Sequence, residues 1–316
     1  MEAMQAEMPA SGGEAERPPL LPLHLYMSGC ATQEEMNANV TATIARGYTP
    51  LNDYIGMFSG AVSICGSAPS LGETYRELRG DVLAINNALP FLLERGVVPK
   101  LCMFWDAAAV VSRFAVPHPD ITYFVGARCH PSVFERLAGC KLIVWHAGGD
   151  HNIAEYLAEH EINEPMVNGG SAGVTRAMFL AYALGYRSLN IFGADSSYSH
   201  DGKTHVNGSL VPEKDIMVSI GNEPGLFFRT TPEWCAQVNE FRDIYQIFRH
   251  PSMGAEIEVF GGGMLPHMAH LMKMKEAAGT LWNTDGTRHA STIHPESRTV
   301  ADQSQLLEKG ATNVSE

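Results

Sequence analysis

The sequence lacks the features that mark several classes of protein. No run of about 18 apolar residues occurs in its 316 residues, so no transmembrane helix is predicted. The acidic segment 1–19 does not have the basic-then-apolar layout of a signal peptide. The six cysteines form no C-x-x-C pair and no Cys/His cluster with zinc spacing. We therefore expect structural thiols and a cytoplasmic protein.

Basic residues are also scarce. The chain has 22 Lys and Arg against 35 Asp and Glu, which gives a formal net charge of −13. Nucleic acids and anionic membrane surfaces repel such a chain, so neither is an expected partner. Hydrophobic residues make up 45% of the sequence and charged residues only 18%, so the chain can bury a sizeable core.

The two ends differ in composition from the middle. Residues 1–20 are rich in Glu, Ala, Pro and Gly, and residues 279–316 are poor in apolar side chains. Both are predicted to be mobile tails. Residues 21–278 are predicted to form a single α/β domain that binds a nucleotide. The sequence does not indicate the oligomeric state.

Short apolar runs alternate with segments of helical spacing along this domain. The predicted strands occupy residues 61–65, 81–85, 101–105, 121–125, 141–146, 188–193 and 256–261. The predicted helices occupy residues 71–78, 87–96, 106–114, 132–139, 151–160, 172–185 and 231–250. This alternation predicts a Rossmann-like, mostly parallel sheet with helices on both faces. The polar segment 195–230 contains no clear strand and is predicted to be a loop or lid insertion.

Ligands bind beyond the carboxyl ends of the strands in an open parallel sheet. GSAPSL (66–71) follows the first predicted strand, and a second small-residue loop, NGGSAG (168–173), precedes the helix 172–185. Glycines allow close approach of the backbone, and a helix start offers N–H groups to a phosphate. The predicted nucleotide-binding residues are therefore Gly66, Ser67, Pro69, Ser70, Gly169, Gly170, Ser171 and Gly173. Plain turns and close helix–sheet packing would use the same small residues.

Polar residues also follow the next two predicted strands. The amides of Asn86 and Asn87 can read a base or a ribose. The carboxylate of Asp106 can bind a ribose or Mg²⁺. Helix capping is the alternative for all three residues.

Two later segments are dense in polar residues. HAGGDHN (146–152) places two histidines, a carboxylate and an amide within seven residues, and 193–205 contains further acidic and basic groups. Histidine and Asp suit general acid–base work or metal binding. The predicted catalytic residues are His146, Asp150, Asp195 and His205. The predicted substrate-binding residues are Asn152, Ser196 and Lys203. Solvated loops are the alternative for both segments.

The order and spacing of these motifs resemble the DUF115 family. This family includes the 6-hydroxymethylpterin diphosphokinases (MptE-like) and the core of the Maf flagellin-modifying glycosyltransferases, and its fold is similar to that of bacterial sialyltransferases. The resemblance spans residues 60–205. It rests on GSAPSL (66–71), WDAA (105–108), HAGGDHN (146–152), NGGSAGVTRAMFLAYALGYRSLNIFGADSSYS (168–199) and DGKTH (201–205).

The diphosphokinase branch implies transfer of pyrophosphate from ATP to a pterin-like alcohol, with acidic residues holding Mg²⁺. HAGGDHN is similar to the HAHGDN-type motif of that branch, which implies roles for His146, Asp150 and Asn152. Mg²⁺ would then lie on Asp106, Asp150 or Asp195. The acidic loop of that branch is replaced by GGSAGVTRA in this sequence.

The Maf branch has a GGSVA-type loop before the helix and a GQDLAY…TH-type segment after the next strand. GGSAG and GADSSYS…DGKTH are closer to these. The resemblance then implies transfer of a sialic-acid-like sugar from a CMP donor to a small-molecule or glycan acceptor. Three hypotheses remain open: this glycosyl transfer, an ATP-dependent pyrophosphokinase, and a nucleotide-binding protein without catalysis.

Overall fold

The computed structural model describes residues 31–148, 151–208, 215–220 and 226–281. The predicted tail 1–20 lies outside these residues, and so does most of the predicted tail 279–316. Within the described ranges, no helix has the length and apolar character needed to cross a membrane.

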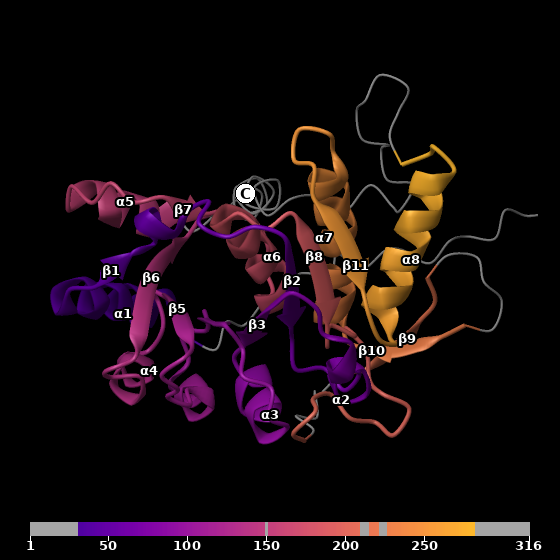
Figure 1. Ribbon diagram of the computed structural model, residues 1–316, viewed down its shortest axis with the longest axis horizontal. Helices are drawn as coiled ribbons and strands as arrows, with labels where there is room; N and C mark the ends of the chain where they lie inside the picture. The colour runs from indigo at the N-terminus through magenta and orange to yellow at the C-terminus, as the bar shows by residue number, and fades with distance from the viewer. Residues whose placement is uncertain (1–30, 149–150, 209–214, 221–225, 282–316) are drawn as a thin grey trace, which may run out of the picture.

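A parallel sheet forms the middle layer of the molecule (Figure 1). Its strand order is β1-β6-β5-β4-β3-β2-β8-β11, and all pairs along this order are parallel. The bounds are β1 (Thr49–Pro50), β2 (Ala61–Cys65), β3 (Asp81–Ile85), β4 (Leu101–Phe104), β5 (Thr122–Gly126), β6 (Lys141–Ala147), β8 (Ser188–Phe192) and β11 (Glu256–Val259). A short strand, β7 (Met166–Val167), pairs with the end of β6. The predicted mostly parallel α/β sheet is confirmed.

Helices cover both faces of the sheet, as predicted. Figure 1 shows α6 (Gly173–Leu184), α7 (Pro232–Arg249) and α8 (Met264–Ala277) above the sheet, with α3 (Ala88–Glu94) and α4 (Pro131–Arg136) below it. Alternate side chains of each strand enter two separate cores: Ile64 packs on the α6–α7 side and Cys65 on the α3–α4 side. The remaining helices are α1 (Gln33–Arg46), α2 (Leu71–Thr74) and α5 (His151–Glu159), with the 3-10 helices η1 (Leu51–Tyr54), η2 (Tyr75–Glu77) and η3 (Ala109–Phe114).

Two predicted elements differ from the structure. The segment 195–230 contains an antiparallel pair, β9 (Ile216–Val218) and β10 (Phe228–Thr230). Each strand is only three residues long, which is too short to show a period in the sequence. The predicted helix 106–114 is instead a 3-10 helix from Ala109, because the Asp106 carboxylate accepts a hydrogen bond from the Ala108 N–H and turns the chain first.

The direction of the chain across the sheet reverses beside β2. From β2 the chain moves outward through β3, β4, β5 and β6, and then returns to β8 on the other side of β2. The carboxyl ends of the strands at such a reversal leave a crevice that commonly binds ligands. The loops that follow β2, β3 and β8 therefore lie where a binding site is expected.

Candidate functional site

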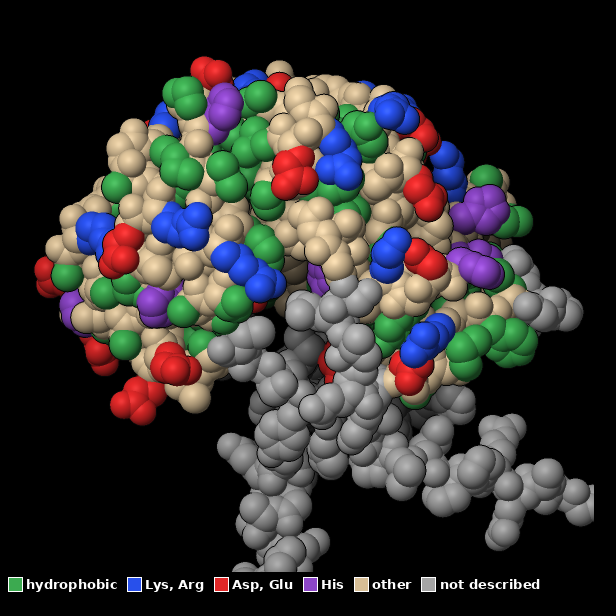
Figure 2. Space-filling view, turned by 90° about the horizontal axis from the view of Figure 1, so that it is seen from below, with side chains coloured by type: hydrophobic (Ala, Val, Ile, Leu, Met, Phe, Trp, Pro, Cys, Tyr) green, Lys and Arg blue, Asp and Glu red, His purple; other side chains and the backbone are tan. Residues whose placement is uncertain are grey.

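A cavity of about 210 Å³ opens at this crevice. Loops after β2, β3 and β8 form its walls, together with the first turn of α6, residues 204–205 and one face of α7. Figure 2 shows that the molecule is hollowed near the middle of one face, with histidine and acidic side chains visible inside the hollow. The structure brings seven predicted site residues to the cavity: Gly66, Ser67, Asn86, Gly173, Asp195, Ser196 and His205.

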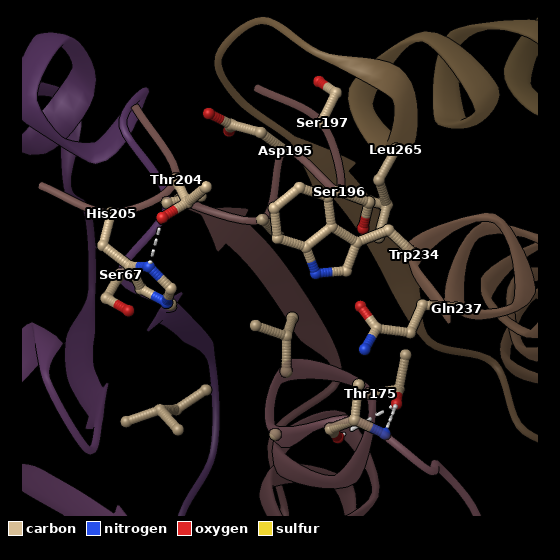
Figure 3. A pocket seen from close by; sticks show the side chains of 18 of the residues that line it. Ser67, Thr175, Asp195, Ser196, Ser197, Thr204, His205, Trp234, Gln237 and Leu265 are labelled. Atoms are coloured by element: carbon tan, nitrogen blue, oxygen red, sulfur yellow. Dashed lines mark hydrogen bonds between the residues drawn. The ribbon is translucent and has the colours of Figure 1, made fainter. Parts of the chain in front are cut away.

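The side chains that line the cavity are mostly small or hydroxylated, and none of those in the described part of the chain is Lys or Arg. Figure 3 shows the indole of Trp234 and the amide of Gln237 on one side, with Ser67 and His205 on the other. The cavity therefore combines an aromatic surface with hydroxyl, amide and imidazole groups. Such a lining can hold a base and a ribose, but it offers little charge to a polyphosphate.

The loops after β2 and β8 approach each other closely because both carry glycine. The Gly66 N–H donates to the Phe192 carbonyl over 2.9 Å, and the Ala68 N–H donates to the Gly193 carbonyl over 3.0 Å. A Cβ on Gly66 would lie 2.3 Å from the Gly193 oxygen. Gly193 itself has a φ of +59°, which disfavours other residues. Gly66 is thus needed for packing between the loops, whatever the cavity binds.

Asp195 joins the same two loops through its side chain. The carboxylate accepts a hydrogen bond from the Ser70 N–H over 3.0 Å and a second, short one from the Ser70 hydroxyl. Only 4% of Asp195 is exposed. Burial raises the pKa of Asp195 to about 6, although the Ser70 hydrogen bonds act in the opposite direction. A carboxyl group with this pKa can take up or release a proton near neutral pH.

Asp195 also separates the first cavity from a second one. Pro69 and Ser70, which were predicted to bind a nucleotide, line the second cavity and not the first. Asp195 and Ser197 line both. In Figure 3 the Asp195 carboxylate points away from Trp234, towards the edge of the first cavity.

His205 reaches the cavity from the segment that follows β8. Its Nδ1 lies 3.0 Å from the Thr204 hydroxyl oxygen. Burial lowers the pKa of His205 below the usual 6.5, and the positive charge of Arg113 adds to this effect. His205 is therefore neutral at pH 7 and can donate one hydrogen bond and accept another.

Two contacts hold this segment over the β2 and β3 loops. The Val206 N–H donates to the Ser67 carbonyl over 2.9 Å, and the Asn207 amide donates to the Asn87 side-chain oxygen over 3.3 Å. Asn87, a predicted nucleoside-binding residue, does not line the cavity and instead anchors the segment that carries His205.

Two residues of the cavity wall have unusual backbone conformations. Asn86 has a φ of 43° and Ser196 a φ of 49°, a region that non-glycine residues seldom adopt. The Asn86 side-chain oxygen is buried and has no hydrogen-bond partner among the described residues. Strained backbone of this kind collects at binding and catalytic sites, so both residues are candidates for ligand contact.

The start of α6 is already occupied by an acidic side chain. Glu240 of α7 accepts hydrogen bonds from the Ser171 N–H at 2.8 Å and from the Ser171 and Thr175 hydroxyls at 2.8 and 3.2 Å. The negative charge of Glu240 lies at the positive end of the α6 dipole, which stabilises the helix. Of the predicted loop 168–173, Ala172 and Gly173 line the cavity, while Gly169 and Gly170 take positive φ values in the turn.

His146 lies outside both cavities. It is 1% exposed, and its Nε2 is 3.2 Å from the Glu164 carboxylate and 3.3 Å from the Tyr48 hydroxyl. Tyr48 in turn donates to Glu164 over 2.9 Å. Burial lowers the pKa of His146, which the neighbouring Glu164 partly offsets. These contacts tie the end of β6 to the segments around Tyr48 and Glu164.

The remaining predicted residues fall elsewhere. Asp106 caps the turn before η3, and Lys203 is exposed and pairs with Asp201 at 2.6 Å. Asp150 lies outside the described residues, and only the position of Asn152 in α5 is described. Among the described residues, which lack Asp150, no group of three or more His, Cys, Asp or Glu could hold a metal ion.

Buried positive charge lies beside the first turn of α6. The ring of Trp105, from the WDAA motif, is contacted by two guanidinium groups, with Arg128 at 4.8 Å and Arg176 at 4.9 Å from its centroid. Arg176 also donates to the Val167 carbonyl over 2.6 Å. Burial lowers the pKa of Arg176 to about 10, with a further contribution from Arg128.

Sequence reasoning missed several residues of the cavity. Trp234 and Gln237 lie three positions apart on α7, so they share one face of that helix. That spacing is visible in the sequence, but nothing in it shows that this face of α7 covers the β2 loop. The other missed polar residues are Thr175, Ser197 and Thr204.

Comparisons with known proteins agree with this fold. A family model described as "6-hydroxymethylpterin diphosphokinase MptE-like" matches residues 37–201, which is more than half of the chain. No curated protein matches the sequence. The structure of the Maf glycosyltransferase from Magnetospirillum magneticum AMB-1 is 16% identical with a TM-score of 0.51, and the match covers 78% of this chain. At that identity the likeness shows a shared fold.

This chain spans 42% of the Maf glycosyltransferase. A second structure, the sialyltransferase CstII from Campylobacter jejuni in complex with the substrate analogue cytidine-5'-monophosphate, is 15% identical. That match covers 66% of this chain and 86% of CstII. Its TM-score of 0.27 is too low to support a structural argument.

Proposed function

The chain belongs to the family described as 6-hydroxymethylpterin diphosphokinase MptE-like, and on this premise we propose that it is a nucleotide-dependent transferase. One observation carries the proposal. The cavity lies beyond the carboxyl ends of β2, β3 and β8, where the strand order reverses and open parallel sheets bind nucleotides. In the β2 loop the N–H groups of Gly66, Ala68 and Ser70 already donate within the protein, so a phosphate there would meet the side chains of Ser67 and His205.

The charge of the lining favours a donor with a single phosphate. ATP carries about four negative charges, and the enzymes that use it hold them with Lys, Arg and Mg²⁺. Among the described residues, those that line this cavity include no Lys or Arg. A sialic-acid-like sugar linked to CMP has one phosphate charge at the reacting bond, which neutral His205 and the Ser67 hydroxyl can stabilise. Trp234 would stack on the base, and Asn86 and Gln237 would contact its edge or the ribose.

The proposed reaction needs one proton acceptor and one donor to the leaving group. The acceptor hydroxyl attacks the anomeric carbon of the sugar, and the bond from that carbon to the phosphate oxygen breaks. The hydroxyl proton passes to the Asp195 carboxylate, whose pKa of about 6 makes it a stronger base than an ordinary carboxylate. CMP leaves with the bonding electrons, and the N–H of neutral His205 stabilises its phosphate.

A second candidate function is an ATP-dependent pyrophosphokinase that acts on a pterin-like alcohol. The description of the family model favours it. Mg²⁺ would have to lie on Asp195, Asp150 or Asp106 together with the phosphates of ATP. Of these carboxylates, Asp195 and Asp106 already accept hydrogen bonds from Ser70 and Ala108.

Calorimetric titration with CMP and with ATP, each in EDTA and in Mg²⁺, tests the proposal. We expect CMP to bind without metal, and Trp234→Ala or Gln237→Ala to weaken it by about tenfold, the size of a lost stacking or polar contact. Gln33→Ala, at an exposed glutamine in α1, is the matched control and should bind normally. Metal-dependent binding of ATP alone would support the pyrophosphokinase. Failure of both nucleotides to bind would overturn both functions.

A further inference from the structure

The second cavity encloses about 510 Å³ on the far side of Asp195. Its walls come from the loop after β2, from residues 195–202, from the β9–β10 pair and from Gly262 and Gly263. Asp195 and Ser197 are common to both cavities. A molecule in the second cavity can therefore meet a molecule in the first at the Asp195 carboxylate.

The lining of the second cavity changes from polar to apolar across its width. Asp195, Ser70 and His200 supply the polar part. Met217 and Phe227 supply the apolar part, and they are 62% and 60% exposed. Large apolar side chains that gather at a cavity while open to solvent usually mark a binding surface.

The charges of this cavity indicate an uncharged ligand. Among the residues that the structure describes, Arg229 is the one Lys or Arg in its lining, and it is already engaged. Its Nε donates to the Asp215 carboxylate, and its guanidinium lies 4.4 Å from the centroid of the Tyr198 ring. Asp195 and Glu73 would repel a phosphate or a carboxylate.

One polar atom in the wall lacks a partner. The hydroxyl of Tyr198 is buried and makes no hydrogen bond within the described part of the chain. The Tyr198 ring packs edge to face against the ring of Trp234, which lines the first cavity, and the two ring centroids are 5.4 Å apart. A ligand hydroxyl beside Tyr198 would satisfy this group and would lie next to the base-stacking surface assigned to Trp234.

We infer that the second cavity is the acceptor subsite, and that the acceptor is an uncharged glycoside with an apolar aglycone. The inference rests on the proposed function only in naming this ligand the acceptor. The sugar lies by Asp195 and Tyr198, and one of its hydroxyls gives its proton to Asp195 as the oxygen bonds to the donor sugar. The apolar aglycone covers Met217 and Phe227, away from the donor.

Octyl β-D-glucoside, kept below its micellar concentration, and methyl β-D-glucoside are suitable probes. Their binding is measured by ligand-observed NMR on the full chain, and CMP binding is measured separately on the same samples. Met217→Gln removes an apolar contact. Gly262→Trp places a large side chain in the wall of the cavity, where no atom lies within 4 Å of the added Cβ. Met57→Gln is the matched control, since Met57 is 65% exposed and lines neither cavity.

The octyl glycoside should bind at least about tenfold more tightly than the methyl glycoside, because it buries apolar surface. Met217→Gln and Gly262→Trp should remove most of this difference, while Met57→Gln keeps it. Equal binding of the two glycosides, or octyl binding that survives Gly262→Trp, would overturn the inference. If the glycoside results hold but CMP does not bind, the amphipathic site stands and the proposed donor function is rejected.

Discussion

Asp195 accepts hydrogen bonds from both the main-chain N–H and the hydroxyl of Ser70, so one buried carboxylate joins the loops after β8 and β2. Burial raises the pKa of Asp195, and the hydrogen bonds from Ser70 lower it. Burial is the larger effect, and it leaves the pKa at about 6. The position of this carboxylate between two cavities gives the group its proposed role as the base.

The first prediction concerns stability as a function of pH. The pKa of Asp195 is about 6 in the folded chain against 3.8 for a free carboxyl, so the folded state binds the proton more tightly. The stability that comes from this tighter proton binding is fully present below about pH 4 and is lost as pH rises through about 6. Between those values we expect wild type to lose on the order of 2 to 3 kcal/mol relative to Asp195→Asn.

Urea denaturation at several pH values measures this difference. Asp53→Asn, which changes an exposed carboxylate in η1, is the control and should follow wild type. Parallel curves for wild type and Asp195→Asn across this range would show that the carboxylate is not perturbed in the folded chain.

The second prediction compares two glycines of the same edge. Gly66→Ala brings a Cβ to 2.3 Å from the Gly193 oxygen and 2.8 Å from the Val174 side chain. We expect it to lower the free energy of unfolding by about 1 to 3 kcal/mol, as overpacking does. Gly262→Ala meets no atom within 4 Å and should change it by less than about 0.5 kcal/mol. Thermal unfolding of both variants tests the contrast, which equal melting temperatures would contradict.

The third prediction concerns the acidic cap of α6. Glu240→Gln removes the negative charge at the helix start and weakens the hydrogen bonds from Ser171 and Thr175. A loss of about 1 kcal/mol is expected from the dipole and hydrogen-bond effects together. Glu159→Gln, at the exposed end of α5, removes the same charge without such contacts. It should leave the free energy of unfolding nearly unchanged. Chemical denaturation distinguishes them, and equal effects of the two changes would remove the special role of Glu240.

The fourth prediction concerns catalysis and rests on the proposed function. Release of CMP from CMP-N-acetylneuraminic acid should rise with pH through about 6, as Asp195 ionises. Asp195→Asn should slow it by about a hundredfold or more, the usual effect of losing a general base. Ser70→Ala should move the rise to higher pH, because the Ser70 hydrogen bonds favour the charged carboxylate. An unshifted profile in Ser70→Ala would argue against Asp195 as the base.

The sheet could be predicted from sequence because its strands are continuous apolar runs. AVSIC, DVLAI and LCMF are buried on both faces, and the first two runs are ended by Gly66 and Asn86. The order of the motifs also gave the family. The pair β9 and β10 was not visible, since strands of three residues are too short to show a period in the sequence.

The site could be predicted only in part for a related reason. Residues next to strand ends, such as Gly66, Asn86 and Asp195, follow from the rule that parallel strands present their carboxyl ends together. His146 also ends a strand, but its side chain turns to Glu164 and Tyr48 and does not enter the cavity. Trp234 and Gln237 come from a helix about 40 residues past β8, and only the packing of α7 brings them to the cavity.

The residues that line the first cavity lie far apart in the sequence, so the ribosome makes them at different times. The wall begins at Gly66 and is completed by Trp234, Gln237 and Leu265. A ribosome that has finished β8 has produced nearly all of the sheet, but the face of α7 that lines the first cavity has not yet been synthesised. The site therefore assembles late in translation, and a nascent chain released before Leu265 would retain most of the sheet without an enclosed pocket.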